Sequence, residues 1–142
     1  MIINQISIFV ENKPGRLAEI LGVLSQNGVD IRALSIADTT DFGILRLIVD
    51  DSKKAYSVLK ENGYVVSITE VIGVCLTDKP GALKAVMDVL NQNNISVEYV
   101  YAFIGGNKGE ALVVFKVADN TQAIEVFKKN GIKVIEDKNF NV

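Results

Sequence analysis

The chain has no histidine, one cysteine and only two prolines among its 142 residues. Without histidine there is no imidazole base, no Ser-His or Cys-His pair and no histidine ligand for a metal ion. The single cysteine, Cys75, rules out an internal disulfide and indicates a reducing compartment. We therefore expect a protein that is not an enzyme, with no catalytic residue, no bound metal and no other cofactor.

Long charged runs and long apolar runs are absent as well. The net charge is −2 and no long basic run occurs, which argues against a nucleic-acid or anionic-membrane surface. No apolar run approaches the roughly 18 residues of a membrane helix, and the first residues, Met1 to Gln5, lack a positively charged signal-peptide start. We expect a soluble cytoplasmic protein, and the 49% of apolar residues can supply its core.

What the chain does contain is an internal repeat. The segment from Glu11 to Leu17, which reads ENKPGRL, returns 66 positions later as TDKPGAL from Thr77 to Leu83. The correspondence resumes 68 positions apart between Asp51–Gly63 and Asp119–Gly131, because two extra residues lie in the glycine-rich loop 105–108. A repeat of this length indicates two copies of one small domain.

The copies divide the chain into domain 1, residues 1–68, and domain 2, residues 69–142. Each has about 70 residues, near the lower limit for independent folding. In domain 1, alternation from Ile6 to Val10 predicts a strand, and apolar residues spaced i, i+3, i+4 and i+7 from Leu17 to Leu24 predict a helix. The other elements expected in domain 1 are strands 31–37 and 44–49, joined by the turn Asp38-Thr39-Thr40-Asp41, a helix from Ser52 that stops at Asn62-Gly63, and strand 65–68. Domain 2 has the same order, with strands expected at 71–76, 97–103, 111–117 and 132–135 and helices at 83–90 and 123–127.

The order in each copy is βαββαβ. This order predicts an α+β fold of two ferredoxin-like domains. Right-handed crossovers then favour a four-stranded antiparallel sheet in the order 4-1-3-2, with both helices on one face.

The turn before the first helix has the features of an anion-binding site. Pro14 suits the first helical position, Gly15 lets a ligand approach the backbone, and Asn12 can cap the helix or bind an amino acid. The unpaired N–H groups and the helix dipole attract a carboxylate. The dipole contributes only about 0.3–1 kcal/mol, whereas a millimolar ligand needs about 4 kcal/mol, so a second surface must close over the ligand.

These residues carry a family resemblance over nearly the whole chain. The segment from Asn12 to Leu17, followed by an amphipathic helix and then Gly28-Val29-Asp30-Ile31, resembles the opening of an ACT domain, and Asp78 to Leu83 with Asn94-Ile95-Ser96-Val97 is a second, altered opening. ACT domains are the amino-acid-sensing modules of enzymes such as phosphoglycerate dehydrogenase and aspartokinase. The resemblance implies a regulatory protein that binds a small amino acid where two ACT domains meet.

Carried over by position, the resemblance implies two sites, each formed by a turn and by the start of the second strand of a neighbouring domain. The expected ligand-binding residues are Asn12, Lys13, Pro14, Gly15, Arg16, Leu17, Asp30, Ile31, Asp78, Lys79, Pro80, Gly81, Ala82, Leu83, Ser96 and Val97.

A structural alternative stays open for several of these residues. Asn12 and Asp78 could be helix caps only, and Asp30 and Ser96 could simply begin their strands. Since Arg16 corresponds to Ala82 and Asp30 to Ser96, the two sites are not equivalent, and we favour the copy that contains Asn12.

The expected second strands contain further features. Tyr99, Tyr101 and Phe103 share one strand face, which either packs between domains or walls a ligand pocket. Arg46 lies in an apolar strand, so its charge must reach solvent or a partner. Cys75 stands where the first copy has Phe9, which indicates packing.

The connection between the copies limits how they can pair. Joining them through their second strands would separate the ends of the linker by about 29 Å, whereas two or three residues span about 10 Å. A single chain therefore cannot form that eight-stranded sheet alone. Because the second strand is an open edge, we expect a homodimer that pairs this edge across a twofold axis.

Three other functions use the same topology or family. RNA recognition needs exposed aromatic residues on the central strands and a basic surface, which this acidic chain lacks, and a metal chaperone needs paired cysteines. The strongest alternative is a regulatory subunit of an amino-acid biosynthetic enzyme, similar to the acetolactate synthase small subunit, whose main surface contacts the catalytic partner.

Overall fold

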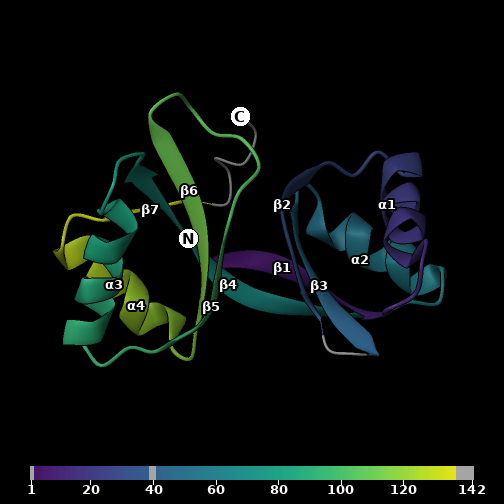
Figure 1. The fold of residues 1–142 in the computed structure, drawn as a ribbon, viewed down its shortest axis with the longest axis horizontal. Coiled ribbons are helices and arrows are strands. Elements are labelled where there is room, and N and C mark those ends of the chain that lie inside the picture. Colours follow the sequence, from purple (N-terminus) through teal and green to yellow (C-terminus); the bar gives the residue numbers. More distant parts are fainter. Residues whose placement is uncertain (1, 39–40, 137–142) are drawn as a thin grey trace. The chain divides into compact units, whose positions relative to one another are not determined.

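The computed structural model describes residues 2–38 and 41–136. Thr39 and Thr40 of the expected turn and the tail 137–142 lie outside these residues. Within the described residues, four helices and seven strands follow one another in the expected order, except that the strands expected at 65–68 and 71–76 are one strand (Figure 1). The elements are β1 Ile2–Glu11, α1 Arg16–Gln26, β2 Ile31–Asp38, β3 Phe42–Val49, α2 Ser52–Glu61, β4 Val65–Thr77, α3 Ala82–Gln92, β5 Val97–Ala102, β6 Glu110–Val117, α4 Asn120–Lys129 and β7 Lys133–Val134.

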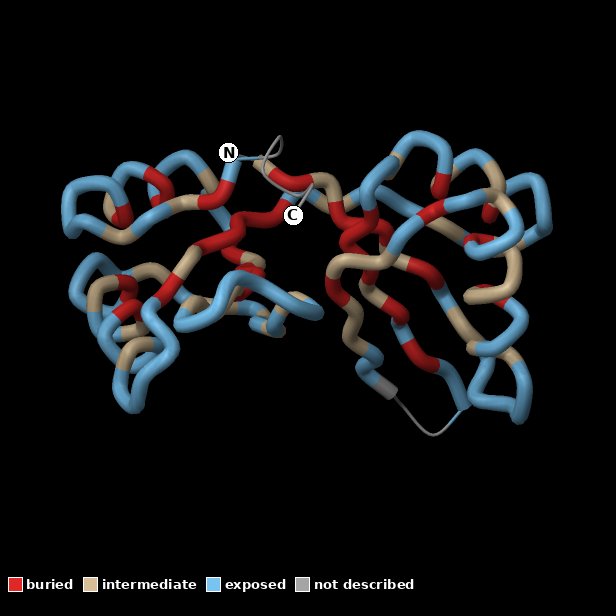
Figure 2. Tube along the Cα trace, turned by 90° about the horizontal axis from the view of Figure 1, so that it is seen from above, coloured by how far each residue is buried: buried red, intermediate tan, exposed pale blue. Residues whose placement is uncertain are grey.

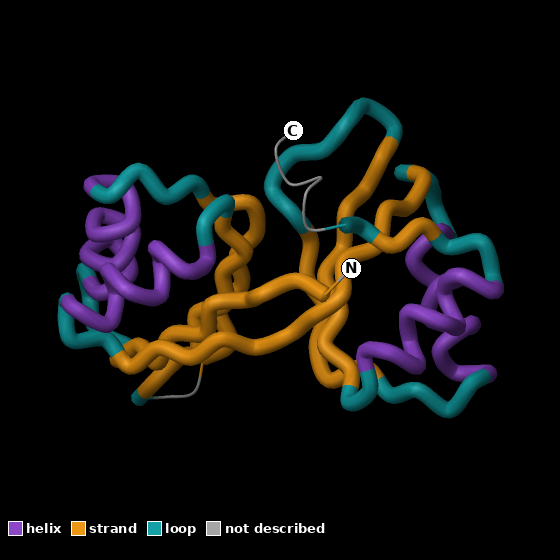
Figure 3. Tube along the Cα trace, turned by 180° about the vertical axis from the view of Figure 1, so that it is seen from behind, coloured by secondary structure: helices purple, strands orange, loops and turns teal. Residues whose placement is uncertain are grey.

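The chain divides into two compact units. The N-terminal unit, Asn4–Thr69, has the strand order β2-β3-β1-β4, and α1 and α2 lie on one side of these strands (Figure 3). Its strands pair antiparallel, with Ile8 opposite Leu45 and Leu34 opposite Leu47. The apolar stripes of the helices and alternate strand residues form its core, which consists of Ile6, Ile8, Ile20, Leu24, Val29, Leu45, Leu47, Val49, Ala55 and Leu59.

The C-terminal unit consists of the chain from Glu70 onward together with the start of β1. Its strand order is β5-β6-β4-β7, with α3 and α4 on one side of the sheet (Figure 3). The core repeats the pattern of the first unit and consists of Ile72, Val74, Leu76, Val86, Leu90, Val113, Phe115, Val117, Ala123, Ile124 and Phe127. In Figure 2 the buried stretches alternate with exposed ones along the trace of each unit. Both units therefore have the predicted order 4-1-3-2.

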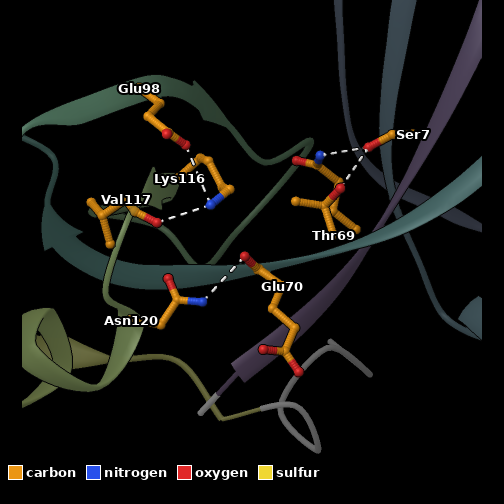
Figure 4. Close-up of polar contacts among 8 residues, drawn as sticks. Ser7, Thr69, Glu70, Glu98, Lys116, Val117 and Asn120 are labelled. Atoms are coloured by element: carbon orange, nitrogen blue, oxygen red, sulfur yellow. Dashed lines mark hydrogen bonds and ion pairs between the residues drawn. The ribbon is translucent and has the colours of Figure 1, made fainter.

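The junction between the copies differs from the sequence prediction. Two separate strands were expected at residues 65–68 and 71–76, but β4 runs without a break from Val65 to Thr77. The reason is local, since no proline occurs in this segment and its first glycine is Gly73. On either side of the division between the units, the Thr69 hydroxyl lies 3.2 Å from that of Ser7, and the Glu70 carbonyl accepts a hydrogen bond from Asn120 at 3.2 Å (Figure 4).

Gly73 allows close packing on β4. A Cβ atom at this position would lie 2.8 Å from Cδ1 of Ile3 and 3.1 Å from Cδ1 of Ile135. Real Cβ atoms do not approach other carbons this closely, so any larger residue here displaces its neighbours. This glycine inside a strand therefore marks a close approach of side chains.

The second strands of the two copies lie at sheet edges. Among the described residues, β2 pairs only with β3 and β5 only with β6. On β5 the rings of Tyr99 and Tyr101 are stacked with centroids 6.4 Å apart. On β3, Arg46 is half-buried opposite Ser7 of β1, and on β5 Glu98 pairs with Lys116 of β6 at 3.3 Å (Figure 4).

Candidate functional site

The two Pro-Gly turns have the same backbone geometry. The N–H of Asn12 donates to the carbonyl of Asp41 at 2.9 Å, and the N–H of Asp78 donates to the carbonyl of Gly109, also at 2.9 Å. These bonds tie each turn to the strand that precedes the second helix of its copy. The start of α1 and the start of α3 are thus held at equivalent places in the two units.

Glycine, rather than asparagine or aspartate, occupies the N-cap position of both helices. Gly15 and Gly81 have φ angles of 83° and 86°, in the left-handed region that glycine adopts without strain. Neither helix has a side-chain cap hydrogen bond. The expectation that Pro14 opens the helix is therefore wrong, and Gly15 and Gly81, not Asn12 and Asp78, occupy the N-cap positions. The physical reason is the left-handed glycine, which turns the chain after the proline and delays the helix to Arg16 and Ala82.

The expected site residues fall into two groups in each unit. Asn12, Lys13, Pro14, Gly15, Arg16 and Leu17 lie in the first turn or the start of α1, and Asp78, Lys79, Pro80, Gly81, Ala82 and Leu83 lie in the second turn or the start of α3. Asp30 and Ile31 lie at the start of β2, and Ser96 and Val97 at the start of β5. A helix of 11 residues separates the groups, which corresponds to about 16 Å. One unit alone does not bring its turn and its second strand together.

Asp30 already has partners in its own unit. Its backbone N–H donates to Oδ1 of Asp50 at 2.9 Å, and its carboxylate lies 3.3 Å from Nη1 of Arg32. It also lines a hollow of about 400 Å³ at the far end of α1, together with Leu21, Leu24, Ser25, Gly28, Val29 and Ile31. An ammonium group at this carboxylate would share it with Arg32.

A cavity of about 240 Å³ lies beside the first turn. We call it the first-copy cavity, and its lining residues are Phe9, Val10, Glu11, Arg16, Phe42, Gly63, Tyr64 and Val65. The rings of Phe9 and Phe42 stack with centroids 4.8 Å apart. Burial raises the pKa of Tyr64, and a hydrogen bond to Glu19 raises it further.

A larger cavity, of about 470 Å³, lies beside the second turn. We call it the second-copy cavity, and its lining residues are Cys75, Leu76, Thr77, Ala82, Ala85, Val86, Val89, Glu110, Asn130, Gly131, Ile132 and Lys133. Burial raises the pKa of the Cys75 thiol, the Glu110 carboxylate raises it further by its charge and by a hydrogen bond, and Lys133 opposes these effects. The two charged side chains therefore both act on the thiol.

The sequence did not single out most of these lining residues. Tyr64, Phe42, Glu110 and Ile132 belong to strands or strand ends that were assigned to the fold only. The repeat itself offered a signal, since each residue of one cavity has a counterpart 66 or 68 positions away. Of the predicted site residues, Arg16 and Ala82 line these cavities beside the turns.

Within residues 2–38 and 41–136, no group of three or more histidine, cysteine, aspartate or glutamate side chains could hold a metal ion. No helix in the same part of the chain has the length and apolar character needed to span a membrane.

Comparisons with known proteins agree with this architecture. A family model described as an ACT domain pair matches residues 1–142. Protein BT0572 from Bacteroides thetaiotaomicron is 39% identical, with a TM-score of 0.92 over 99% of this chain and 96% of that chain. The ligand-free regulatory subunit of aspartate kinase from Thermus thermophilus is 12% identical, with a TM-score of 0.66 over 89% of this chain and 90% of that chain. A search of curated proteins found no match.

Two ferredoxin-like units in one chain, with equivalent glycine turns at the starts of α1 and α3, define a tandem α+β repeat protein. Within this class the chain belongs to the ACT domain pair family. The predicted fold class and the predicted family are both confirmed.

Proposed function

We propose that this chain is a non-catalytic, cytoplasmic regulatory protein that binds a small amino acid at ACT domain interfaces. The observation that carries this proposal is the pair of helix starts, which have the same left-handed glycine and no side-chain cap. Backbone N–H groups at such a helix start favour a carboxylate. The same geometry occurring twice in one chain supports binding rather than an accident of one turn.

The second half of each site comes from a neighbouring domain. Asp30 and Ser96 lie a helix length away from the turns of their own units, so a turn meets such a residue only across an interface. Asp30 would then accept a hydrogen bond from the α-ammonium group of the ligand, in competition with Arg32 at 3.3 Å. We infer a homodimer, in which amino-acid binding favours one packing of the domains over another.

A regulatory subunit that acts mainly through protein contact is the second candidate. One observation favours it. On β1 and β3 of the N-terminal unit, Phe9, Phe42 and Ile44 are 48%, 42% and 39% exposed, and grouped apolar side chains of this kind mark interaction surfaces. Copurification of a metabolic enzyme with the chain from its host, lost when Phe42 is replaced by serine, would support this candidate.

A thermal-shift screen of the twenty amino acids tests the main proposal. A ligand present at 100 times its Kd stabilises the folded state by about 2.7 kcal/mol, which raises the melting temperature by several degrees. We expect one amino acid, or a few similar ones, to produce this shift. We expect Asn12→Ala, in the first turn, or Asp30→Ala, which removes the proposed acceptor for the ammonium group, to reduce it.

Asp51→Ala is the matched control. It removes the cap of α2, whose carboxylate accepts from the N–H of Lys54 at 3.0 Å, so it should lower the melting temperature without changing the shift caused by the ligand. If none of the twenty amino acids shifts the melting temperature at millimolar concentration, the proposal is wrong.

A further inference from the structure

The two cavities occupy equivalent places in the repeat. Every one of the eight residues that line the first-copy cavity has its counterpart, 66 or 68 positions later, in the lining of the second-copy cavity. The strand registers agree, because Glu11 lies opposite Phe42 in one unit and Thr77 lies opposite Glu110 in the other. Differences between the cavities therefore come from side chains, and not from different backbones.

Three side chains at or near the first-copy cavity, those of Arg16, Glu19 and Tyr64, have small or aliphatic counterparts in the second copy. Nη1 of Arg16 lies 3.0 Å from Oε2 of Glu19, and burial together with the Glu19 carboxylate raises the pKa of Tyr64. Arg16 and Tyr64 line the first-copy cavity, and Glu19 follows Arg16 by three residues on α1. The counterparts are Ala82, Ala85 and Ile132, and the second-copy cavity extends past them along α3 to Val86 and Val89.

The two cavities differ in volume. Pockets that bind small molecules measure about 300–1,000 Å³. The second-copy cavity, at about 470 Å³, lies within this range, and the first-copy cavity, at about 240 Å³, lies below it. The first-copy cavity therefore leaves about half the room of the second-copy cavity beside its turn.

The lining of the second-copy cavity indicates the kind of ligand. Leu76, Val86, Val89 and Ile132 form an aliphatic wall, whereas Glu110 and Lys133 carry charges of opposite sign. An aliphatic wall selects an aliphatic group through burial, and the two charges suit the ammonium and carboxylate of a zwitterion. Ala82 connects this cavity to the Pro-Gly turn at Gly81.

We propose that the second-copy cavity, and not the first-copy cavity, holds the ligand, and that this ligand is an amino acid with an aliphatic side chain. The inference rests on the proposed function for the class of ligand, but it places this ligand within one unit, beside the second turn, and not between a turn and the second strand of a neighbouring domain. It departs from the sequence expectation, which favoured the copy containing Asn12. A filled first copy then keeps a structural role, while the open second copy senses the ligand.

Cys75 provides a direct probe of this cavity. It is the only cysteine of the chain, it lines the second-copy cavity and it is partly exposed. A thiol reagent such as iodoacetamide therefore modifies this one site. A ligand present at ten times its Kd leaves about one cavity in eleven empty, so a ligand that covers the thiol slows modification about 11-fold.

The experiment measures how fast iodoacetamide alkylates Cys75 in the full chain. The rate in the presence of valine, leucine or isoleucine is compared with the rate in the presence of serine, aspartate or lysine, and calorimetry measures the binding of each amino acid. The refilled variant, Ala82→Arg with Ala85→Glu and Ile132→Tyr, places the side chains of the first copy in the second. Its mirror control, Arg16→Ala with Glu19→Ala and Tyr64→Ile, empties the first copy and leaves the second unchanged. Circular dichroism confirms folding, and Ala85→Glu alone serves if the refilled variant does not fold.

We expect an aliphatic amino acid to protect Cys75, the refilled variant to lose both protection and binding heat, and the mirror control to keep both. Binding to the refilled variant at the original affinity would overturn the inference. So would protection by a polar amino acid, or calorimetric binding that leaves alkylation unchanged, although the proposed function would survive either result. Faster alkylation on dilution to a monomer would show that a second copy fills the cavity. Absence of binding by any amino acid would overturn the proposed function as well.

Discussion

Individual residues act differently in the two copies even where the backbone is the same. On α1, Arg16 and Glu19 form an ion pair at 3.0 Å. Their counterparts on α3 are Ala82 and Ala85, which have no charged group. An exposed pair of this kind stabilises a protein by only about 0.2–1 kcal/mol. Its larger effect is steric, since it occupies space beside the turn.

The thiol of Cys75 gives a prediction at this scale. Burial raises its pKa and the nearby Glu110 carboxylate raises it further, so less reactive thiolate is present near neutral pH. Glu110→Gln removes the negative charge, and we expect the pKa to fall and alkylation at pH 8 to become faster. Lys133→Ala removes the opposing positive charge and should make alkylation slower. The measurement is the alkylation rate from pH 7 to 10, and coinciding profiles for the native and Glu110→Gln proteins would contradict the assignment.

Helix ends show how neighbouring elements of one fold begin in different ways. The second helices of both copies begin with an aspartate, since Asp51 accepts from the N–H of Lys54 and Asp119 from that of Gln122, each at 3.0 Å. The first helices begin with a left-handed glycine and no side-chain cap. The uncapped starts are those beside the turns of the proposed ligand site.

This contrast predicts unequal effects of two aspartate substitutions. Asp119→Ala removes a cap and should lower the free energy of unfolding by about 0.5–2 kcal/mol. Asp78→Ala removes an exposed aspartate that caps nothing and should change it by less than about 0.5 kcal/mol. Urea unfolding of both variants measures the difference. Equal losses would mean that Asp78 stabilises the start of α3 after all.

Most elements could be predicted because their signals are local. The apolar spacing from Leu17 to Leu24 identified α1. The start of α1 was misplaced because Pro14 was given the helical position that a left-handed Gly15 postpones. The break expected near Thr69 does not exist in β4. Both errors concern the backbone conformation at the end of a helix or strand, where the same residues are compatible with more than one place for the element to begin or end.

The cavities were harder to predict than the elements. They depend on residues far apart in the sequence, such as Cys75, Glu110 and Ile132, which strand pairing brings together. The size of each cavity depends on which side chains fill it, so Tyr64 was not recognised as a residue that closes a site. A comparison of the two copies, position by position, shows which side chains differ between the cavities, but only the strand register shows which positions line a cavity.

At the scale of the whole molecule, β2 and β5 each have one strand edge that is open to pairing among the described residues. Each has backbone hydrogen-bonding groups on one side without a partner strand among the described residues. Exposed edges of this kind recruit another strand unless something blocks them. The homodimer proposed above would use one of these edges.

Charged substitutions can identify the edge. Ala37 on β2 and Val100 on β5 are both exposed, so lysine at either position should leave the fold intact and discourage strand pairing. We expect the native chain to sediment as a dimer at micromolar concentration. One of the variants Ala37→Lys and Val100→Lys should shift it toward monomer, and the other serves as its control. A native monomer, with or without amino acids, would contradict the proposed assembly, and two unaffected dimers would contradict pairing through these edges.

The uninterrupted β4 has a consequence for how the protein denatures. Its first residues, Val65–Thr69, belong to the N-terminal unit and the rest, Glu70–Thr77, to the C-terminal unit, so no residue outside a strand lies between the repeats. Fraying of the first repeat from its final strand would propagate directly into the opening strand of the second. Since the two small units share this backbone segment, we expect them to unfold together in one thermal transition.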